Sequence, residues 1–218
     1  MPEPSSSRAR IMAGIRMSLG TASTPDAIAA EYASIPRTYT RSSNSSRAEL
    51  LELLTDRLIE YDAGVYTARS QTIAETIAQM LTKRGKSGLA IPAALPQGWL
   101  PEGFVFDMAK GFDAYQLDRS QGILSGCTVA IAETGSIVLQ NADAQGARIL
   151  SLVPDYHLCV VFASQVVATV PEAFTRLAAT STLPTTFISG PSATADIEMT
   201  RIKGVHGPRF LDVLLVED

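Results

Sequence analysis

Hydrophobic residues recur at helical spacing in stretches that begin at Ser46, Thr72 and Thr169. Each stretch opens with a serine or threonine followed three residues later by glutamate, the pattern of a capping box. The hydrophobic positions that follow are Leu50, Leu54, Leu58 and Tyr61; Ile73, Ile77, Met80 and Leu81; and Val170, Phe174, Leu177 and Ala178. The spacing predicts amphipathic helices with these residues facing inward.

Short hydrophobic runs rich in β-branched residues alternate with the predicted helices and are typical of strands. They are VYTA (65–68), GLAIP (88–92), FVFDM (104–108), VAIA (129–132), SIVLQ (136–140), LCVVF (158–162), TTFIS (185–189) and VLLVE (213–217). GLAIP and FVFDM have the composition of buried strands. The alternation predicts an α/β fold, a mostly parallel sheet flanked by helices, over residues 46–218.

Residues 1–45 have a different character, small, polar and interrupted by proline. A weakly amphipathic helix is predicted from Arg8 to Leu19, and Thr24 followed by Pro25 suits the start of a second helix. We interpret this region as a helical arm, partly flexible, that packs on the domain or on a partner. Partial disorder is the alternative.

The composition excludes several classes of protein. The chain is 46% hydrophobic and 18% charged, as expected of a soluble globular protein, and its net charge of −4 argues against nucleic-acid binding. No hydrophobic run has the roughly 20 residues that a membrane span requires. Arg16 interrupts the N-terminal hydrophobic stretch, so a secretory signal is not expected and a cytoplasmic location is the default.

Motifs for cofactors and metals are absent from the sequence. Cys127 and Cys159 are isolated, so no CxxC cassette exists for zinc or an iron–sulfur cluster. We expect Cys159 to be a core residue and Cys127 to be structural or near a site, with no disulfide between them. The chain has no GxGxxG, GxxxxGK[ST], HExxH or GxSxG motif. No metal and no cofactor are expected in this chain.

Three segments concentrate polar and turn-forming residues. In GCTVAIAETGSIVL, Glu133 stands in a loop where it could act as a base or nucleophile, although a hairpin turn explains ETGS equally well. In SLVPDYHLCVV, Asp155 and His157 could share a proton or orient a substrate, or could satisfy loop backbone groups.

The third segment, ISGPSATADIEMTRIKGVHGPR (188–209), follows a predicted strand. Ser192 or Thr194 could cap a helix beginning near Ala195, whose exposed N–H groups would attract an anion. Ligands of parallel sheets bind where strands end and loops lead into helices. Asp196, Glu198, His206 and Arg209 are charged or titratable candidates in this segment. The alternatives are that Asp196 is a helix-dipole partner and that GVHGPR is a rigid turn.

Together these segments resemble the lactate utilization protein C family, also described as LUD-domain proteins. The resemblance rests on SGCTVAIAETGSIVL, RILSLVPDYHLCVV and ISGPSATADIEMTRIKGVHGPRFLDVLLVED, in the family's order, from about Tyr115 to Asp218. It implies a fold similar to sugar-phosphate isomerases, amino-sugar-phosphate deaminases and CoA transferases. It also implies a role in oxidising L-lactate to pyruvate alongside iron–sulfur partner proteins, which would carry the clusters.

The resemblance also selects site residues. Glu133, Thr134 and Gly135 match its AETG segment, and a loop glutamate is the covalent nucleophile of the related CoA transferases. The other matching positions are Ser189, Gly190, Ser192, Thr194, Asp196, His206, Gly207 and Arg209. Glu133, Asp196 and His206 are the catalytic candidates, with Arg209 or His206 pairing with a carboxylate in a common cleft. The ligand-binding candidates are Thr134, Gly135, Ser189, Gly190, Ser192, Thr194 and Arg209.

Three hypotheses for function follow. The first is an accessory or substrate-handling subunit of an iron–sulfur lactate-oxidising system. The second is an independent enzyme acting on a small phosphorylated or CoA-linked acid through Glu133. The third is a sensor of a carboxylate metabolite, which needs only an anion-binding cleft.

Overall fold

The structure, a computed structural model, describes residues 6–20, 24–194, 202–203 and 207–217, with the backbone alone at 194, 202 and 203. The chain divides into two compact units, Met1–Tyr39 and Thr40–Asp218. The boundary lies N-terminal to the one predicted at residue 45. None of the helices in the described ranges is long and apolar enough to cross a bilayer.

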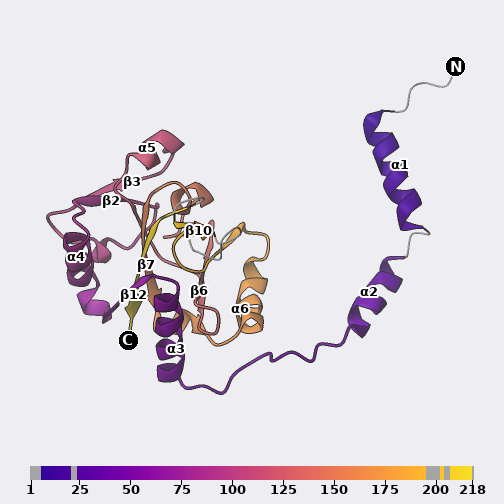
Figure 1. Ribbon diagram of the computed structural model, residues 1–218, viewed down its shortest axis with the longest axis horizontal. Helices are drawn as coiled ribbons and strands as arrows, with labels where there is room; N and C mark the ends of the chain where they lie inside the picture. The colour runs from indigo at the N-terminus through magenta and orange to yellow at the C-terminus, as the bar shows by residue number, and fades with distance from the viewer. Residues whose placement is uncertain (1–5, 21–23, 195–201, 204–206, 218) are drawn as a thin grey trace. The chain divides into compact units, whose positions relative to one another are not determined.

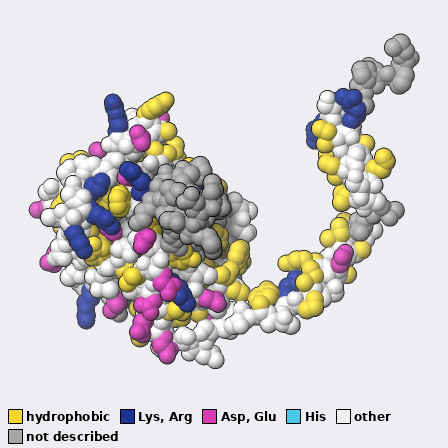
Figure 2. Space-filling view, viewed as in Figure 1, with side chains coloured by type: hydrophobic (Ala, Val, Ile, Leu, Met, Phe, Trp, Pro, Cys, Tyr) yellow, Lys and Arg dark blue, Asp and Glu magenta, His cyan; other side chains and the backbone are white. Residues whose placement is uncertain are grey.

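The N-terminal unit contains helices α1 (Ser7–Leu19) and α2 (Pro25–Ser34), where the sequence predicts them. The side chains of Ser6 and Thr24 accept hydrogen bonds from the first turns, and Pro25 is the first residue of α2. No residue of either helix is buried. Met17 is 81% exposed, and Figure 2 shows hydrophobic side chains along the surface of this arm.

The second unit contains all the other elements (Figure 1). Its helices are α3 (Arg47–Glu60), α4 (Ile73–Lys83), α5 (Ala114–Asp118) and α6 (Val170–Leu177). Its strands are β1 (Gly64–Ala68), β2 (Gly88–Ile91), β3 (Val105–Met108), β4 (Ile123–Ser125), β5 (Val129–Ile131), β6 (Ser136–Gln140), β7 (Tyr156–Phe162), β8 (Val166–Val167), β9 (Thr185–Ile188), β10 (Ala193–Thr194), β11 (Ile202–Lys203) and β12 (Phe210–Val216).

A six-stranded parallel sheet, in the order β1-β12-β7-β4-β2-β3, forms the centre of this unit. Successive side chains of a strand point to opposite faces, so β7 and β12 contribute to two separate cores. Tyr156, Leu158 and Leu214 pack with the buried face of α4 on one side. Cys159, Val161 and Val213 pack with Leu54 and Leu58 of α3 on the other. The predicted α/β fold with a mostly parallel sheet flanked by helices is confirmed.

A second sheet, in the order β8-β5-β6-β9, packs on the α3 side of the first. It is mixed, because β6 is antiparallel to both β5 and β9 whereas β8 is parallel to β5. Ala130, Ile137 and Leu139 face the core shared with the first sheet. Val129, Ile131 and Val138 face α6, so helices and sheets stack as α4, first sheet, second sheet and α6 (Figure 1).

Several details differ from the sequence-based expectations. FVFDM forms an edge strand with Val105 62% exposed, because β2 alone among the described strands pairs with it. Phe174 of α6 points outward, where its ring lies 6.0 Å from that of Phe187. Thr72 makes no side-chain cap of α4, because its hydroxyl group bonds with the backbone of Arg69 instead.

Candidate functional site

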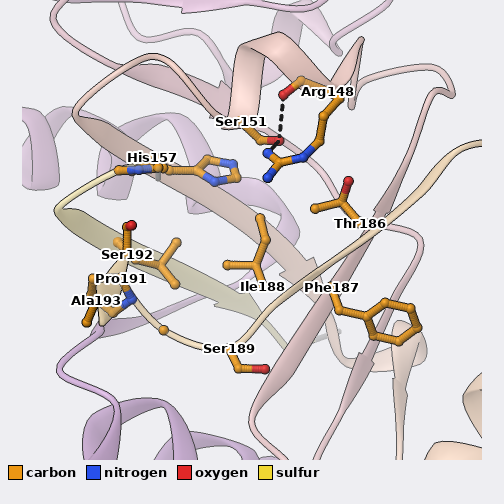
Figure 3. Close-up of a pocket in the computed structure, with 14 residues that line it drawn as sticks. Arg148, Ser151, His157, Thr186, Phe187, Ile188, Ser189, Pro191, Ser192 and Ala193 are labelled. Carbon is orange, nitrogen blue, oxygen red and sulfur yellow. Dashed lines mark hydrogen bonds between the residues drawn. The ribbon is translucent and has the colours of Figure 1, made fainter. Parts of the chain in front are cut away.

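A pocket of about 400 Å³ opens between the two sheets (Figure 3). His157 and Leu211, the second residues of β7 and β12, line it from the first sheet. Ser189 to Ala193, the loop that follows β9, line it from the second. The pocket therefore lies at the amino ends of β7 and β12. The loop that follows β9 lines the pocket, but β9 is an antiparallel strand of the mixed sheet, so the pocket does not lie at the carboxyl ends of parallel strands.

His157 and Ser151 are buried polar residues of the pocket lining, and His157 has 1% of its surface exposed. The pairing of β4 with β7 brings His157 close to Ser125. Ile123 of β4 pairs with His157 and Ser125 pairs with Cys159, so the side chains of Ser125 and His157 are diagonal neighbours on one face of the sheet. Ser125 Oγ and His157 Nε2 are 2.7 Å apart. Among the described residues, His157 Nδ1 has no hydrogen-bond partner.

Arg148 extends from the 3₁₀ turn Arg148–Ser151 into the same pocket, toward the ring of His157 (Figure 3). Arg148 Nη1 donates to Ser151 Oγ at 3.1 Å, and Ser151 Oγ donates to the carbonyl oxygen of Arg148 at 3.2 Å. Among the described residues no carboxylate pairs with Arg148. An anion entering the pocket would therefore find a guanidinium group whose charge is not neutralised there.

Burial sets the protonation state of His157. Desolvation disfavours the imidazolium form and lowers the pKa of His157 to about 4. The ring is therefore neutral near pH 7 and adds no charge beside Arg148. A neutral imidazole offers one donor and one acceptor, and Ser125 already occupies one of these nitrogens.

The ETGS segment forms the turn between β5 and β6, so the hairpin interpretation is confirmed. Glu133 is exposed on this turn and does not line the pocket. Thr134 Oγ1 donates to Ser136 Oγ at 2.8 Å, and Ser136 Oγ lies 2.7 Å from Ser189 Oγ. This chain of hydroxyl groups connects the turn to the wall of the pocket.

The glycines of both signature loops are explained by close packing on α3. A Cβ atom at Gly135 (φ 60°) would stand 2.7 Å from Arg57 Cβ. One at Gly190 (φ 83°) would stand 2.5 Å from Tyr61 Cβ. Both positions lie in the left-handed region, where glycine alone is unstrained. The end of α3 therefore fixes the position of both loops.

Other predicted site residues lie elsewhere. Arg209 forms a bidentate ion pair with Asp155, at 2.5 Å between Nε and Oδ1 and 2.8 Å between Nη2 and Oδ2, and does not line the pocket. Arg209 holds the pKa of Asp155 below its usual range. Asp155 and His157 thus have different partners and do not share a proton.

Of the remaining candidates, Ser189, Gly190 and Ser192 line the pocket, as does Gly207 of the third segment. The backbone of Thr194 belongs to β10, which pairs with β11. Asp196, Glu198 and His206 lie outside the described residues, as does most of the helix predicted near Ala195.

Arg148, Ser151 and Ser125 were missed as site residues by reasoning from the sequence. Arg148 and Ser151 belong to RILSLVPDYHLCVV, so the resemblance marked their segment without selecting them. Ser125 is the first residue of SGCTVAIAETGSIVL, so the resemblance marked its segment too, but only the pairing of β4 with β7 brings it to His157.

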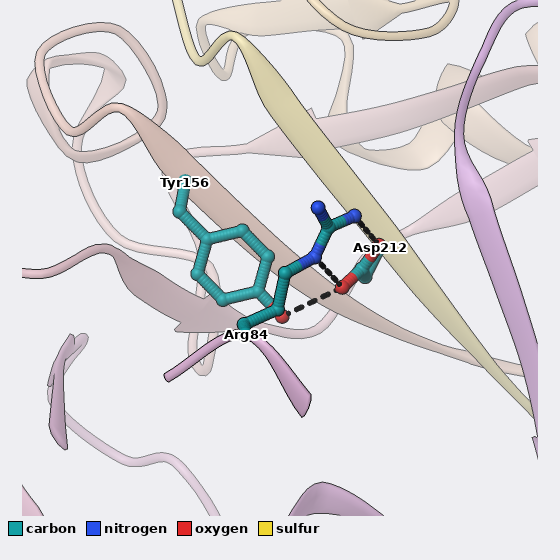
Figure 4. Close-up of polar contacts among 3 residues, drawn as sticks. All are labelled: Arg84, Tyr156 and Asp212. Atoms are coloured by element: carbon teal, nitrogen blue, oxygen red, sulfur yellow. Dashed lines mark hydrogen bonds and ion pairs between the residues drawn. The ribbon is translucent and has the colours of Figure 1, made fainter. Parts of the chain in front are cut away.

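A second polar cluster lies at the amino end of β12, on the α4 face (Figure 4). The fully buried Asp212 accepts from Arg84 Nε at 2.8 Å, Arg84 Nη2 at 2.5 Å and Tyr156 Oη at 3.0 Å. Burial and the Asp212 charge raise the pKa of Tyr156. All three side chains satisfy one another, which indicates a structural role.

Metal ligands do not gather in the described ranges. No group of three or more His, Cys, Asp or Glu side chains comes together there. The two buried cysteines are free thiols, and the pKa of Cys127 is raised well above its usual value by its contact with Cys159 and by burial. The Cys127 thiol is therefore protonated and a poor metal ligand near pH 7. The cofactor expectation itself stays a prediction.

The sequence matches a known family model and several proteins that share a name. The family model described as the LUD domain matches residues 42–216. A lactate utilization protein C of Deinococcus radiodurans is 41% identical over 174 residues, which cover 78% of this chain and 81% of that protein. A protein of the same name from Macrococcus caseolyticus is 29% identical over 190 residues, 78% of this chain and 79% of its own.

One solved structure is similar across the same region. It is the crystal structure of a DUF162 family protein from Deinococcus radiodurans at 1.70 Å resolution. The two chains are 36% identical with a TM-score of 0.69, and the match covers 79% of this chain and 99% of the other.

Proposed function

The chain belongs to the LUD domain family, and on this premise we propose that it is a substrate-handling subunit of an iron–sulfur system that oxidises L-lactate to pyruvate. The relatives named lactate utilization protein C support the metabolic context. The redox clusters belong, in this proposal, to partner proteins. This chain contributes a pocket that holds a small carboxylate.

The observation that carries the proposal is Arg148 beside a buried, neutral histidine. A guanidinium group can bind both oxygens of a carboxylate, and hydrogen bonds to charged groups are stronger than neutral ones. The pocket volume of about 400 Å³ lies within the usual range for small ligands. The exposed edge of Arg148 gives a ligand access from solvent, whereas His157 lies deeper.

The size of lactate decides the kind of test. Lactate has six heavy atoms, and even the best small ligands reach only about −1.5 kcal/mol per atom. A millimolar dissociation constant is therefore expected, and the activity of the assembled complex is a sharper readout of the proposed function than affinity. The test is a tagged purification from native cells grown on lactate, with mass spectrometry, iron analysis and lactate-dependent dye reduction.

The expected result is copurification of iron–sulfur proteins and lactate-dependent dye reduction. Loss of a charged hydrogen-bonding partner is worth about 1.5–3 kcal/mol, so Arg148→Met should lower that reduction by roughly 10- to 100-fold. Arg176→Met is the control, because Arg176 is exposed and does not line this pocket. Full activity of Arg148→Met, or purification without iron-bearing partners, would contradict the proposal.

The alternative of an independent enzyme has its own observation, the exposed Glu133 joined to the pocket wall through Thr134, Ser136 and Ser189. It predicts an acyl or thioester adduct on Glu133, with turnover of a CoA-linked or phosphorylated acid. Glu133→Gln would remove the adduct and the turnover. A Glu133→Gln variant with unchanged turnover would exclude this role.

A further inference from the structure

A second cavity, of about 390 Å³, borders the carboxyl ends of β2 and β3. Pro92 and Ala93, which directly follow β2, line it, as do residues 109–112, which directly follow β3. Ile149 and Leu150 line it from the chain between β6 and β7. We call this cavity the second pocket, and the pocket that Arg148 lines the first pocket.

The strand order puts the second pocket where ligands of parallel sheets usually bind. In the first sheet β2 and β4 are neighbours, and the chain continues from β2 to β3 on one side and from β4 to β7 on the other. Ligands of open α/β sheets bind outside the carboxyl ends of the strands, at such a reversal of strand order. The second pocket, unlike the first, lies at the carboxyl ends of parallel strands.

Two alanines beside the second pocket have a strained backbone. Ala94 (φ 63°) and Ala144 (φ 60°) lie in the left-handed region, which is unfavourable for a residue with a Cβ atom. The N–H of Ala144 donates to the carbonyl oxygen of Ala93 at 3.4 Å, so the two loops are joined next to the lining. Strain of this kind is concentrated at active sites and ligand-binding sites of proteins.

The side chains of the lining limit the chemistry of a ligand. Among the described residues that line this pocket, Lys110 alone has a side chain with a hydrogen-bonding atom, and the others are alanine, glycine, proline, isoleucine, leucine and phenylalanine. A ligand rich in hydroxyl or amide groups would bury them there without side-chain partners, which is costly. Lys110 is exposed, and no carboxylate of the described ranges pairs with it. The lining therefore favours an apolar ligand with one anionic group.

The 3₁₀ turn Arg148–Ser151 separates the two pockets. Its first and last residues line the first pocket, whereas the two between them, Ile149 and Leu150, line the second. The two pockets are therefore adjacent but have different lining residues, and each can be altered without removing a side chain of the other.

We propose that the second pocket is a separate binding site for an aliphatic monocarboxylate with a longer chain than lactate. The chain of the ligand packs against Phe112, Ile149 and Leu150, and its carboxylate lies at Lys110. This inference goes beyond the proposed function and does not depend on it, because it concerns other side chains at another place in the fold.

Nuclear magnetic resonance of the full chain with ¹³C-labelled isoleucine methyl groups tests the site. Ile149 reports on the second pocket and Ile188 on the first, and the variants Ile149→Val and Ile188→Val identify each signal by its loss. In titrations with butanoate, hexanoate and octanoate, we expect the Ile149 signal to shift and the dissociation constant to fall about fourfold for each added methylene group. No shift of Ile149, or an affinity that does not rise with chain length, would overturn the inference.

The role of Lys110 is tested with a probe that lacks the charge. Lys110→Met should weaken hexanoate binding by about two- to fivefold, the effect of an exposed ion pair, and leave the binding of 1-hexanol unchanged. An equal effect on the two probes, or none on hexanoate, would contradict the placement of the carboxylate at Lys110.

The location of the chain is tested by filling the second pocket. Ala147 lines it and is exposed, so Ala147→Phe can place a ring there without entering the core of the domain. In samples whose folding is verified by circular dichroism, we expect hexanoate affinity to fall by about tenfold or more. Unchanged hexanoate binding in Ala147→Phe would overturn the location.

Arg148→Met is the control that separates the two pockets, because it removes the guanidinium group of the first and no side chain of the second. We expect the Ile149 signal of this variant to respond to hexanoate as it does in the wild type. Loss of that response would mean that hexanoate binds through the first pocket, and would overturn the inference. The dye-reduction assay of the same variant tests the proposed function, so either proposal can fail without the other.

Discussion

At the scale of single residues, the polar groups buried in the first sheet fall into two kinds. Asp212 is satisfied by Arg84 and Tyr156, so its charge is compensated inside the fold. His157 has one satisfied nitrogen and one without a partner in the described residues, beside a pocket. This difference separates a structural cluster from a candidate ligand site, although both lie at the amino ends of the same strands.

The Arg84–Asp212 pair predicts an asymmetric response to substitution. The Asp212 side chain is fully buried, whereas that of Arg84 is 30% exposed. Arg84→Met would leave a buried carboxylate without its cation and should lower the free energy of unfolding by about 3–5 kcal/mol. Asp212→Asn should lower it less, because the guanidinium group that remains can reach water.

Urea unfolding at pH 7 measures both effects. Tyr156→Phe is the control, because it removes one hydrogen bond to Asp212 and leaves the ion pair, with an expected loss of about 1 kcal/mol. A larger loss of unfolding free energy in Asp212→Asn than in Arg84→Met would show that the exposure of the guanidinium group does not decide which substitution destabilises the domain more.

His157 predicts a specific dependence of stability on pH. Burial lowers the pKa of His157 to about 4, below the value of about 6.5 in an unfolded chain. The unfolded state therefore takes up the proton first as pH falls. The stabilisation is fully present above about pH 6.5 and is lost as the pH falls toward about 4, with a total of about 3 kcal/mol.

The measurement is urea unfolding of the wild type and of His157→Asn at several pH values between about 4 and 7. We expect the wild type to lose more stability than the variant across this range, because the variant has no imidazole to protonate at this position. Parallel pH profiles would contradict the burial argument.

At the scale of the elements, similar serine caps have different consequences for the stability of the domain. Ser6 and Ser46 each accept a hydrogen bond from the third residue of their helix at 3.3 Å. Helix α3, which Ser46 caps, buries Leu54 and Leu58 in the core of the domain. Helix α1, which Ser6 caps, buries no residue.

Substitution of these caps by alanine should separate local from global stability. Ser46→Ala is expected to lower the free energy of unfolding of the domain by about 1 kcal/mol, because α3 is part of its cooperative core. Ser6→Ala is expected to leave that free energy unchanged and only to weaken α1. Urea unfolding followed by tryptophan fluorescence reports on the domain, since Trp99 packs against its core. An equal loss in the two variants would contradict this separation.

The last turn of α3 positions two loops near the candidate site. Gly135 and Gly190, in turns that follow different strands, both pack closely against Arg57 or Tyr61 at the end of this helix. The helix, which the sequence predicts from its own spacing, thus positions two loops that the sequence shows only as glycine-containing turns.

At the scale of the whole molecule, the two units differ in what they bury. No residue of α1 or α2 is buried, whereas the unit Thr40–Asp218 contains every core cluster found in the described residues. Removal of residues 1–39 should therefore leave the melting temperature of the domain unchanged within about 2 °C, since a loss of 1 kcal/mol would lower it by about 2–4 °C.

The test compares differential scanning calorimetry of the full chain and of a chain that begins at Thr40. The shortened chain retains Arg41, whose carbonyl oxygen accepts from Thr169 Oγ1, and Ser43, whose N–H donates to Glu172. A drop of more than about 5 °C would mean that the N-terminal unit contributes to the stability of the domain.

The sequence by itself determined the elements whose signals are local. Capping residues and helical spacing lie within a few positions of one another, so Ser46 and Thr169 cap α3 and α6 as predicted, and the β-branched runs form strands. The family signature also contains the loop from Ser189 to Ser192, which lines the pocket. These features need no knowledge of which strands become neighbours.

The tertiary structure alone decided how the strands divide between two sheets and which side chains meet. The pairing of β4 with β7 joins Ser125 to His157 across 32 positions of sequence, and the packing of the second sheet on the first closes the pocket beside Arg148. Arg209 pairs with Asp155, 54 positions away, rather than with a ligand. Strand order and register create these contacts, and neither is encoded in the spacing of residues along one strand.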